Sequence, residues 1–270
     1  MCGRYASSRR PEDLVEEFEV ATSRVPAPLA ADWNVAPTKE VYAVLERPPR
    51  STGRDEEPAE RQLRVLTWGL VPSWAKDPSI GNRMINARVE TVAEKPAFRK
   101  AFAARRCLLP ADGYYEWYPT SALTRAGKPA KQPFFIRPRD HGVLAMAGLY
   151  EIWRDPTRDE DDPARFRWTC TVLTTEAEDD LGHIHDRMPL TVDRERWAEW
   201  LDPTASGADL RGLLTPAAPG RLEAYPVATL VSNVRNNGPE LVEPLPLEDL
   251  DPDVVDEVEA RRVPAAGEAS

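Results

Sequence analysis

The sequence predicts an α+β fold in which a few helices flank a central, mostly antiparallel, β-barrel-like sheet. Short runs rich in β-branched and aromatic residues dominate the chain, and Pro, Gly and Asp bound them. Segments with helical spacing are fewer, and no internal repeat is present. With 270 residues the chain is long enough to bury a large core.

Three segments carry apolar residues at helical spacing. Residues 10–18 place Pro11 and two acids in a first helical turn, as such a turn prefers, and three apolar side chains on one face. Residues 94–106 and 191–201 have similar spacing. We expect a helix in each segment.

The expected strands are apolar runs of roughly five to eleven residues separated by turn residues. They comprise residues 41–45, 63–71, 106–110, 113–118, 133–138, 143–153 and 167–175. Beyond about Leu250 the chain is charged and poor in core residues. The sequence therefore predicts one domain over residues 1–249 and an acidic, disordered tail over residues 250–270.

Composition limits the partners of this chain. No apolar run approaches the length of about 20 residues that a membrane span needs, and the N-terminus lacks a signal peptide, so we expect a cytoplasmic protein. The net charge of −10 argues against a broad nucleic-acid-binding face. Between Arg83 and Arg106, however, seven Lys or Arg face two acids, which leaves room for a local positive surface.

Metal and cofactor chemistry lacks its usual sequence signatures. The chain has three histidines, with no HExxH motif or carboxylate cluster, and neither GxGxxG nor a P-loop occurs. The three cysteines are widely spaced. Cys107 and Cys170 lie in strand-like apolar runs and are expected to be inert core residues, whereas Cys2 directly follows the initiator methionine.

Cys2 raises the possibility of a catalytic amino terminus. Removal of Met1 by a methionine aminopeptidase would leave an α-amine and a thiol on one residue. We expect this removal, because a residue as small as cysteine permits it. The alternative is that Cys2 is an ordinary small residue near a chain end.

Three further stretches carry polar groups suited to chemistry. NARVET supplies Asn86 and Arg88, which are two apart and so share one side of an extended segment. Glu116 sits among aromatic residues, where apolar surroundings would raise its pKa toward that of a proton-transfer group. HDRMP supplies His185 and Arg187. Each stretch also has a structural alternative: a turn cap for the asparagine, a solvent-facing strand position for the glutamate, and a helix exit for HDRMP.

Taken together, these stretches resemble the SRAP family, the SOS response-associated peptidases or abasic site processing proteins. The matching blocks follow the family's order and cover the chain from Met1 to about Pro244. They are MCGRYA, WNVAPT, WGLVPSWAKD, INARVETVAEKPAFRKAF, RRCLLPADGYYEW, KQPFFIRP, AMAGLYEIW, IHDRMP and VSNVRNNGPELVEP.

The resemblance implies a single SRAP domain with a central β-barrel-like sheet. It also implies a protein that needs no cofactor, acts as a monomer and binds single-stranded DNA containing abasic sites. Such a protein would associate with the nucleoid when engaged on DNA. In this family the cysteine behind the methionine is the catalytic amino terminus. Its α-amine attacks the ring-opened sugar to form a Schiff base, and its thiol then closes a thiazolidine crosslink. Lyase-type strand cleavage and reversal of the crosslink are possible further steps.

The resemblance also implies a role for individual residues. Cys2 is the nucleophile, Glu116 a general acid/base, His185 a proton-transfer aid, and Asn86 orients the cysteine or the sugar. The implied DNA contacts are the phosphate-binding Arg4, Arg88 and Arg187, the wedge formed by Trp74 and Pro37, and the polar positions Thr174 and Ser232. One departure is Ala75, where some family members carry a second aromatic residue.

Other functions stay open at this stage. N-terminal-nucleophile hydrolases also begin Met-Cys-Gly and use the amine as base for their own thiol. Their further motifs are poorly matched, since only NNGPEL resembles them. A cysteine peptidase would use Cys2, His185 and Glu116. A non-covalent reader of modified or single-stranded DNA would use the same pocket only for binding, and replacement of Cys2 by alanine would leave its function intact.

Overall fold

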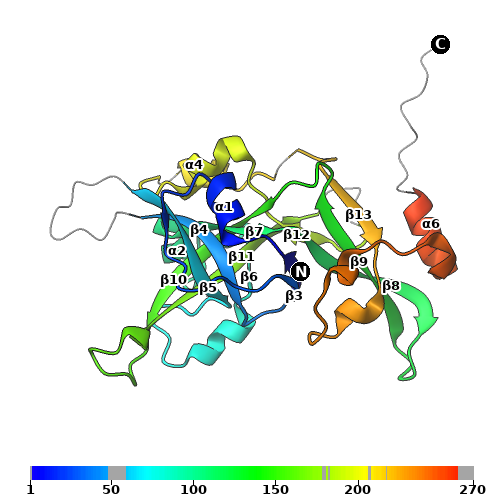
Figure 1. The fold of residues 1–270 in the computed structure, drawn as a ribbon, viewed down its shortest axis with the longest axis horizontal. Helices are drawn as coiled ribbons and strands as arrows, with labels where there is room; N and C mark the ends of the chain where they lie inside the picture. The colour runs from blue at the N-terminus through cyan, green and yellow to red at the C-terminus, as the bar shows by residue number, and fades with distance from the viewer. Residues whose placement is uncertain are drawn as a thin grey trace, which may run out of the picture.

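The structure is a computed structural model, and it describes residues 2–47, 59–177, 181, 183–205, 208–216 and 218–260. Figure 1 shows a barrel-like body, next to which strands β8, β9 and β13 form a second sheet. The long strands of both sheets correspond to the apolar runs of the sequence, whereas the short strands match none of them.

The barrel is made from five strands that close on themselves. β5, β4, β7, β10 and β11 are neighbours in that order, and parallel pairing of β11 with β5 completes the circle, with Cys170 opposite Trp68. Their bounds are β4 (Glu40–Arg47), β5 (Glu60–Trp68), β7 (Arg106–Ala111), β10 (Leu144–Arg154) and β11 (Phe166–Glu176). Short strands extend this sheet: β2 (Thr22–Ser23) pairs with β5, whereas β6 (Asn86–Arg88) and β12 (Arg187–Pro189) pair with β11. The predicted α+β class with a barrel-like sheet is confirmed.

The second sheet is antiparallel and brings the amino terminus to the barrel. Its strand order is β13-β9-β8-β1-β3. The bounds are β1 (Tyr5–Ser7), β3 (Asp32–Val35), β8 (Gly113–Leu123), β9 (Pro129–Pro138) and β13 (Leu222–Pro226). Because β1 is held between β3 and β8, the first residues of the chain are fixed by backbone pairing rather than free.

The described helices are short; all but the last cover the barrel's outer surface, and the last lies against β8 of the second sheet. They are α1 (Pro11–Glu17), α2 (Arg99–Ala104), α4 (Trp197–Leu201), α5 (Ala208–Gly212) and α6 (Pro252–Ala260), with 3₁₀ turns at Pro78–Arg83, Pro163–Arg165, Arg194–Arg196, Thr229–Ser232, Pro239–Val242 and Leu247–Asp249. The helix expected over residues 94–106 begins only at Arg99, because Pro96 disfavours helical geometry in the residue before it. Among the described residues, no helix combines the length and apolarity that a membrane span requires.

Two packed layers stabilise this arrangement. Alternate residues of the barrel strands fill its interior, among them Leu45, Trp68, Met146 and Cys170, and Cys107 is buried there too. The other face of the strands packs against the helices. Both cysteines are therefore core residues, as predicted, and burial raises the pKa of each thiol.

The tail prediction is wrong for residues 252–260, which form α6. Val254 is only 1% exposed and belongs to the same buried cluster as the residues of the barrel interior. Asp253 Oδ2 accepts a hydrogen bond of 2.6 Å from the backbone N–H of Ser121. Valines spaced along one face let this acidic segment bury an apolar stripe, which the charge-rich composition conceals. Residues 261–270, the rest of the predicted tail, lie outside the described residues.

Candidate functional site

Cys2 lies fully buried just before β1, and one hydrogen bond connects it to the barrel. The side-chain amide of Asn86 donates to the backbone oxygen of Cys2 over 2.7 Å. Asn86 opens β6, whose parallel pairing places it opposite Val172 of β11. Asn86 is thus a strand residue rather than a turn cap, and its amide fixes the backbone of Cys2.

The surroundings of Cys2 keep its thiol protonated. Burial raises the pKa of the Cys2 thiol, and the negative charge of Glu116 raises it further. The positive charge of the Met1 amino group and the backbone N–H of Arg4, which hydrogen-bonds the sulfur, act in the opposite direction but are weaker. A neutral thiol is a weak nucleophile, so this environment suits a reaction in which an amine attacks first.

Glu116 faces inward from β8 and is only 4% exposed. Burial raises its pKa to about 7, with the negative charge of Asp186 contributing, although the positive charge of the amino terminus counteracts the rise. The solvent-facing interpretation of Glu116 is therefore wrong. A carboxyl group with this pKa populates both protonation states near neutral pH, which is the requirement for general acid–base work.

His185 presents a half-buried imidazole close to the same charges. Burial lowers its pKa, and the charges of the amino terminus and Lys131 contribute, so the neutral ring dominates near pH 7. Its Nδ1 lies 2.8 Å from Asp186 Oδ1 and 3.0 Å from the backbone N of Arg187. These two contacts use one nitrogen in opposite senses: a protonated Nδ1 donates to Asp186, whereas an unprotonated one accepts from Arg187. Lys131 and Asp186 act on the pKa of both Glu116 and His185, which places the two groups in one electrostatic environment.

The Arg187 side chain is largely engaged within the protein. Its guanidinium forms a two-point ion pair with Glu90, at 2.5 Å and 3.1 Å, and donates to the backbone oxygen of Thr174 over 2.6 Å. Thr174 is fully buried and pairs with both neighbouring strands, opposite Arg88 of β6 and Pro189 of β12. Arg88, in contrast, is exposed. The two arginines therefore differ in how readily they can take a phosphate.

Arg4 belongs to a second polar group on the other side of Cys2. Its Nη1 donates to Asn34 Oδ1 at 2.6 Å and to the backbone oxygen of Val231 at 2.9 Å. The guanidinium also lies 5.7 Å from the ring centroid of Trp117, whose Nε1–H donates to Ser232 Oγ over 3.0 Å. Arg4 therefore connects β1 to the segment that carries Ser232.

Trp74 stands on the surface loop that follows β5, and 57% of its surface is exposed. The loop is anchored by its neighbour: Ala75 is buried, and its backbone oxygen accepts a 2.7 Å hydrogen bond from the indole of Trp153. A small residue at position 75 therefore fits the packing beneath Trp153. Pro37 is half-buried and precedes Thr38, whose N–H donates to Trp68 at the end of β5, where the loop begins.

Glycines shape the start of this loop. Gly69 has a φ of +135°, a conformation that side chains disfavour, and a Cβ there would lie 2.7 Å from the backbone oxygen of Gly81. The two backbones approach this closely only because both residues lack a side chain.

The sequence analysis missed several residues that shape the site. Glu90 holds Arg187, and Trp117 links Arg4 to Ser232. Asn34, which is fully buried, donates to the backbone oxygens of Val231, Asn233 and Asn236. The blocks WNVAPT and NARVET contain two of these residues, but only the fold shows what they contact. Within the described ranges, no cluster of three or more His, Cys, Asp or Glu residues is arranged to hold a metal ion.

Comparisons with known proteins point to one family. A family model described as SOS response associated peptidase (SRAP) matches residues 1–234. The chain is 37% identical over 244 residues to abasic site processing protein YoqW of Bacillus subtilis, covering 90% of this chain and 99% of that protein. It is 33% identical over 254 residues to abasic site processing protein YedK of Escherichia coli, covering 91% and 100%. An X-ray structure of a Bacteroides thetaiotaomicron protein matches with a TM-score of 0.73 at 25% identity, covering 90% of this chain and 100% of that one.

Proposed function

The chain belongs to the SOS response associated peptidase (SRAP) family, and we propose that it processes abasic sites in DNA by covalent capture at Cys2. The observation that carries this proposal is the contact between Asn86 and the Cys2 backbone beside the buried Glu116. The names of the relatives, which describe abasic site processing proteins, support the substrate.

The proposed reaction uses both groups of an amino-terminal cysteine. With Met1 removed, the α-amine of Cys2 adds to the aldehyde of the ring-opened deoxyribose, and loss of one water gives a Schiff base. The thiol sulfur then adds to the imine carbon while its proton moves to the nitrogen, which closes a five-membered thiazolidine. An α-amine has a pKa of about 8, so a useful fraction is neutral and nucleophilic near pH 7.

Glu116 and His185 supply the proton transfers in this scheme. Protonated Glu116 donates to the sugar ring oxygen and so assists ring opening, and its carboxylate form accepts a proton from the attacking amine. Its pKa of about 7 makes both forms accessible. The neutral imidazole of His185 moves the proton that accompanies loss of water or a following β-elimination. Asn86 positions Cys2 through the backbone contact.

The DNA strand is proposed to lie along the exposed groups around this centre. Arg88 is the first candidate phosphate contact, because it is exposed on the strand next to Thr174. Arg187 can take a phosphate only by giving up Glu90. Trp74 offers its exposed indole to a flanking base, which favours single-stranded DNA or a junction at which duplex ends. Arg4, Pro37 and Ser232 lie nearby in this proposal.

A denaturing gel tests the mechanism directly. Purified protein is mixed with single-stranded DNA carrying one abasic site, and intact mass spectrometry of the same sample reports whether Cys2 is the amino terminus. We expect a heat-stable protein–DNA band for the wild type and none for Cys2→Ala. Cys2→Ser keeps the amine and should give a species that is trapped only by borohydride reduction. Cys107→Ala is the matched control, since that cysteine is also buried but lies on β7, which pairs with β4 and β10 rather than with the strand of Asn86.

The remaining functions appear as distinct outcomes of this experiment. Absence of a band despite a free Cys2 would contradict covalent capture. Retained DNA binding in Cys2→Ala would then support a non-covalent reader, and turnover of a peptide or glutamine substrate that depends on Cys2 would support the hydrolase or peptidase function.

A further inference from the structure

A second candidate site lies at the far end of the barrel from Cys2. There a cavity of about 440 Å³ is lined by the first residues of β11, Phe166 and Trp168. Asn86, which holds Cys2, pairs instead with Val172, four residues beyond Trp168 along the same strand. A strand rises about 3.3 Å per residue, so the two sites occupy opposite ends of the barrel.

Strand alternation aims the cavity's side chains into the barrel mouth. Trp168 is two residues before Cys170, and Arg64 is two residues before Leu66; both Cys170 and Leu66 fill the barrel interior. Arg47 follows the interior residue Leu45 by the same spacing. Side chains two residues apart on a strand share one face. Trp168, Arg64 and Arg47 therefore lie on the interior face of the barrel strands, at the end of the apolar interior.

The cavity concentrates positive charge on an acidic protein. Arg24, Arg47 and Arg64 line it, although the chain carries a net charge of −10. Among the described residues, the acidic group beside it is Glu60, which lies 3.7 Å from Arg24 and accepts a hydrogen bond from Gln62. Within this described part of the chain, three guanidinium groups line the cavity beside one carboxylate, a lining that favours an anionic ligand.

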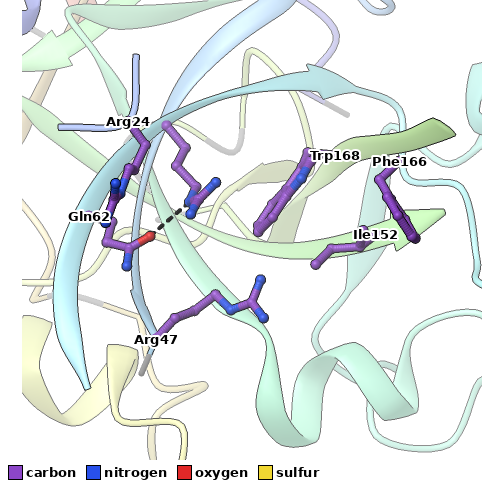
Figure 2. Close-up of a pocket in the computed structure, with 7 residues that line it drawn as sticks. Arg24, Arg47, Gln62, Ile152, Phe166 and Trp168 are labelled. Carbon is purple, nitrogen blue, oxygen red and sulfur yellow. Dashed lines mark hydrogen bonds between the residues drawn. The ribbon is translucent and has the colours of Figure 1, made fainter. Parts of the chain in front are cut away.

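Arg64 is held in place before any ligand arrives. Its guanidinium stacks 4.3 Å from the ring centroid of Trp168, and its Nε donates to Gln62 Oε1 over 2.9 Å. Gln62 is only 2% exposed, so this acceptor is itself fixed. Arg47 approaches the same indole at 5.1 Å. Figure 2 shows the guanidinium group of Arg47 directed toward the space in front of Trp168. A planar donor fixed in this way matches phosphate oxygens with little loss of side-chain entropy.

The opposite wall of the cavity is apolar. Phe166 leaves half of its surface exposed, and Ile152 lies beside it in Figure 2. A ligand that fills the space must therefore pair an anionic group with a flat apolar body, and pockets of roughly 300–1,000 Å³ hold molecules of that size. We propose that this barrel mouth binds a nucleotide, with its phosphate on Arg47 and Arg64 and its base against Phe166. The nucleotide is either free or the 5′-phosphorylated end of a DNA strand.

Calorimetric titration with four probes tests the proposal. They are dAMP, deoxyadenosine, inorganic phosphate and a 5′-phosphorylated oligonucleotide without an abasic site. We expect dAMP or the oligonucleotide to bind saturably below about 1 mM. The double variant Arg47→Gln/Arg64→Gln should lose at least about tenfold in affinity for whichever of them binds, and deoxyadenosine should bind more weakly than dAMP by a similar factor. Binding of dAMP that the double variant loses identifies a free nucleotide, whereas binding of the oligonucleotide that the double variant weakens, without binding of dAMP, identifies a strand end.

Arg167→Gln is the matched control. It removes an arginine from the same part of β11, but that side chain points to the other face, toward Trp153 and Asp155. If the double variant does not fold, Arg24→Gln removes one half-exposed charge from the rim and should weaken binding by a smaller factor. The proposal is overturned if neither probe binds, or if both bind the double variant as tightly as the wild type. Crosslinking to abasic DNA should be unchanged in the double variant, so failure here is separable from failure of the proposed function.

Discussion

Glu116 carries the strongest pH dependence expected of a single residue. Its folded-state pKa of about 7 exceeds the ordinary value of 4.5, so the native state binds this proton more tightly than the unfolded chain does. Its contribution to stability is therefore complete below pH 4.5 and is lost as the pH rises to about 7. Glutamine does not ionise, so Glu116→Gln should not lose stability as the pH rises. Above pH 7 this variant should therefore be more stable than the wild type by up to about 3 kcal/mol.

Urea unfolding between pH 4.5 and pH 8 measures this difference, with the exposed Glu176→Gln as control. A free-energy difference that stays flat across the window would show that Glu116 does not bury its charge. In the same variant the rate of crosslinking should fall, because glutamine can neither donate to the ring oxygen as an acid nor accept the amine proton.

Asn86 acts on the reaction through the backbone of Cys2. Asn86→Ala removes the 2.7 Å hydrogen bond and should cost about 1 kcal/mol of stability. We expect the single-turnover crosslinking rate to drop by about tenfold or more, while affinity for single-stranded DNA stays near that of the wild type. Single-turnover kinetics and a fluorescence anisotropy titration separate the two effects. Asn233→Ala, which changes an exposed asparagine, is the control. Equal losses in rate and affinity would mean that Asn86 binds DNA rather than positioning Cys2.

At the scale of residues, the sequence indicated the candidate groups of the site but not the side chains and backbone atoms that they contact. MCGRYA, NARVET, GYYEWY and HDRMP each supplied a residue of the site, and the contact between Asn86 and Cys2 spans 84 positions. The ion pair of Arg187 with Glu90 spans 97 positions, and nothing in either local pattern indicates it. Such partners follow from strand pairing, which a single sequence does not specify.

Among the elements, β6, β11 and β12 together present the two candidate phosphate contacts, and the structure predicts different behaviour for them. Arg88→Glu should weaken binding of single-stranded DNA without lowering stability, since this side chain is exposed. Arg187→Glu should weaken binding and also destabilise the fold by about 1–3 kcal/mol, because Glu90 loses its ion pair and gains a like-charged neighbour, and the Thr174 oxygen keeps only the N–H of Val89 as donor.

Thermal melts beside binding titrations distinguish these outcomes, and Glu90→Gln serves as a further variant. If Glu90 only competes with phosphate, its removal should raise DNA affinity while lowering stability slightly. If Arg187→Glu has the same melting temperature as the wild type, the ion pair between Arg187 and Glu90 does not stabilise the fold as predicted.

The α6 helix is the element at which the sequence prediction failed, and it yields a direct test. Val254 is buried against the barrel-side cluster, so Val254→Asp should destabilise the protein by about 2 kcal/mol or more. Asp256→Asn, an exposed change on the same helix, should be neutral. Denaturant midpoints measure both. If Val254→Asp has the same denaturant midpoint as the wild type, Val254 is not packed against the protein, and the disordered tail that the composition predicts is supported instead.

For the whole molecule, the class of fold was predictable and its closure was not. The apolar runs gave nearly every long strand, because strand periodicity is a local signal. Closure depends on the parallel pairing of β11 with β5, which joins positions about 100 residues apart. Once β11 and β5 close the barrel, it has two distinct ends. Cys2 lies near one end, and the arginine-lined cavity lies at the other. Neither site was visible as a unit in the sequence.

The net charge of the whole molecule predicts how DNA binding depends on salt. A chain with a charge of −10 repels DNA except where arginines face the strand, and of the three candidates Arg4 and Arg187 are engaged within the protein. For single strands the logarithm of the binding constant falls with the logarithm of salt concentration by about 0.7 per phosphate contacted. One to three contacts therefore predict a slope between about −0.7 and −2.

Arg88→Gln should make that slope shallower by about 0.7, whereas Arg137→Gln, which removes an arginine paired with Glu223, should leave it unchanged. Affinity measured between low and moderate salt provides the slope for non-abasic DNA. A slope steeper than about −4 would require a broad basic face and contradict this assignment. Salt should slow crosslinking to abasic DNA in proportion to the lost affinity, yet leave an existing crosslink intact, because the proposed thiazolidine bond is covalent and the arginines are proposed only to deliver the strand to Cys2.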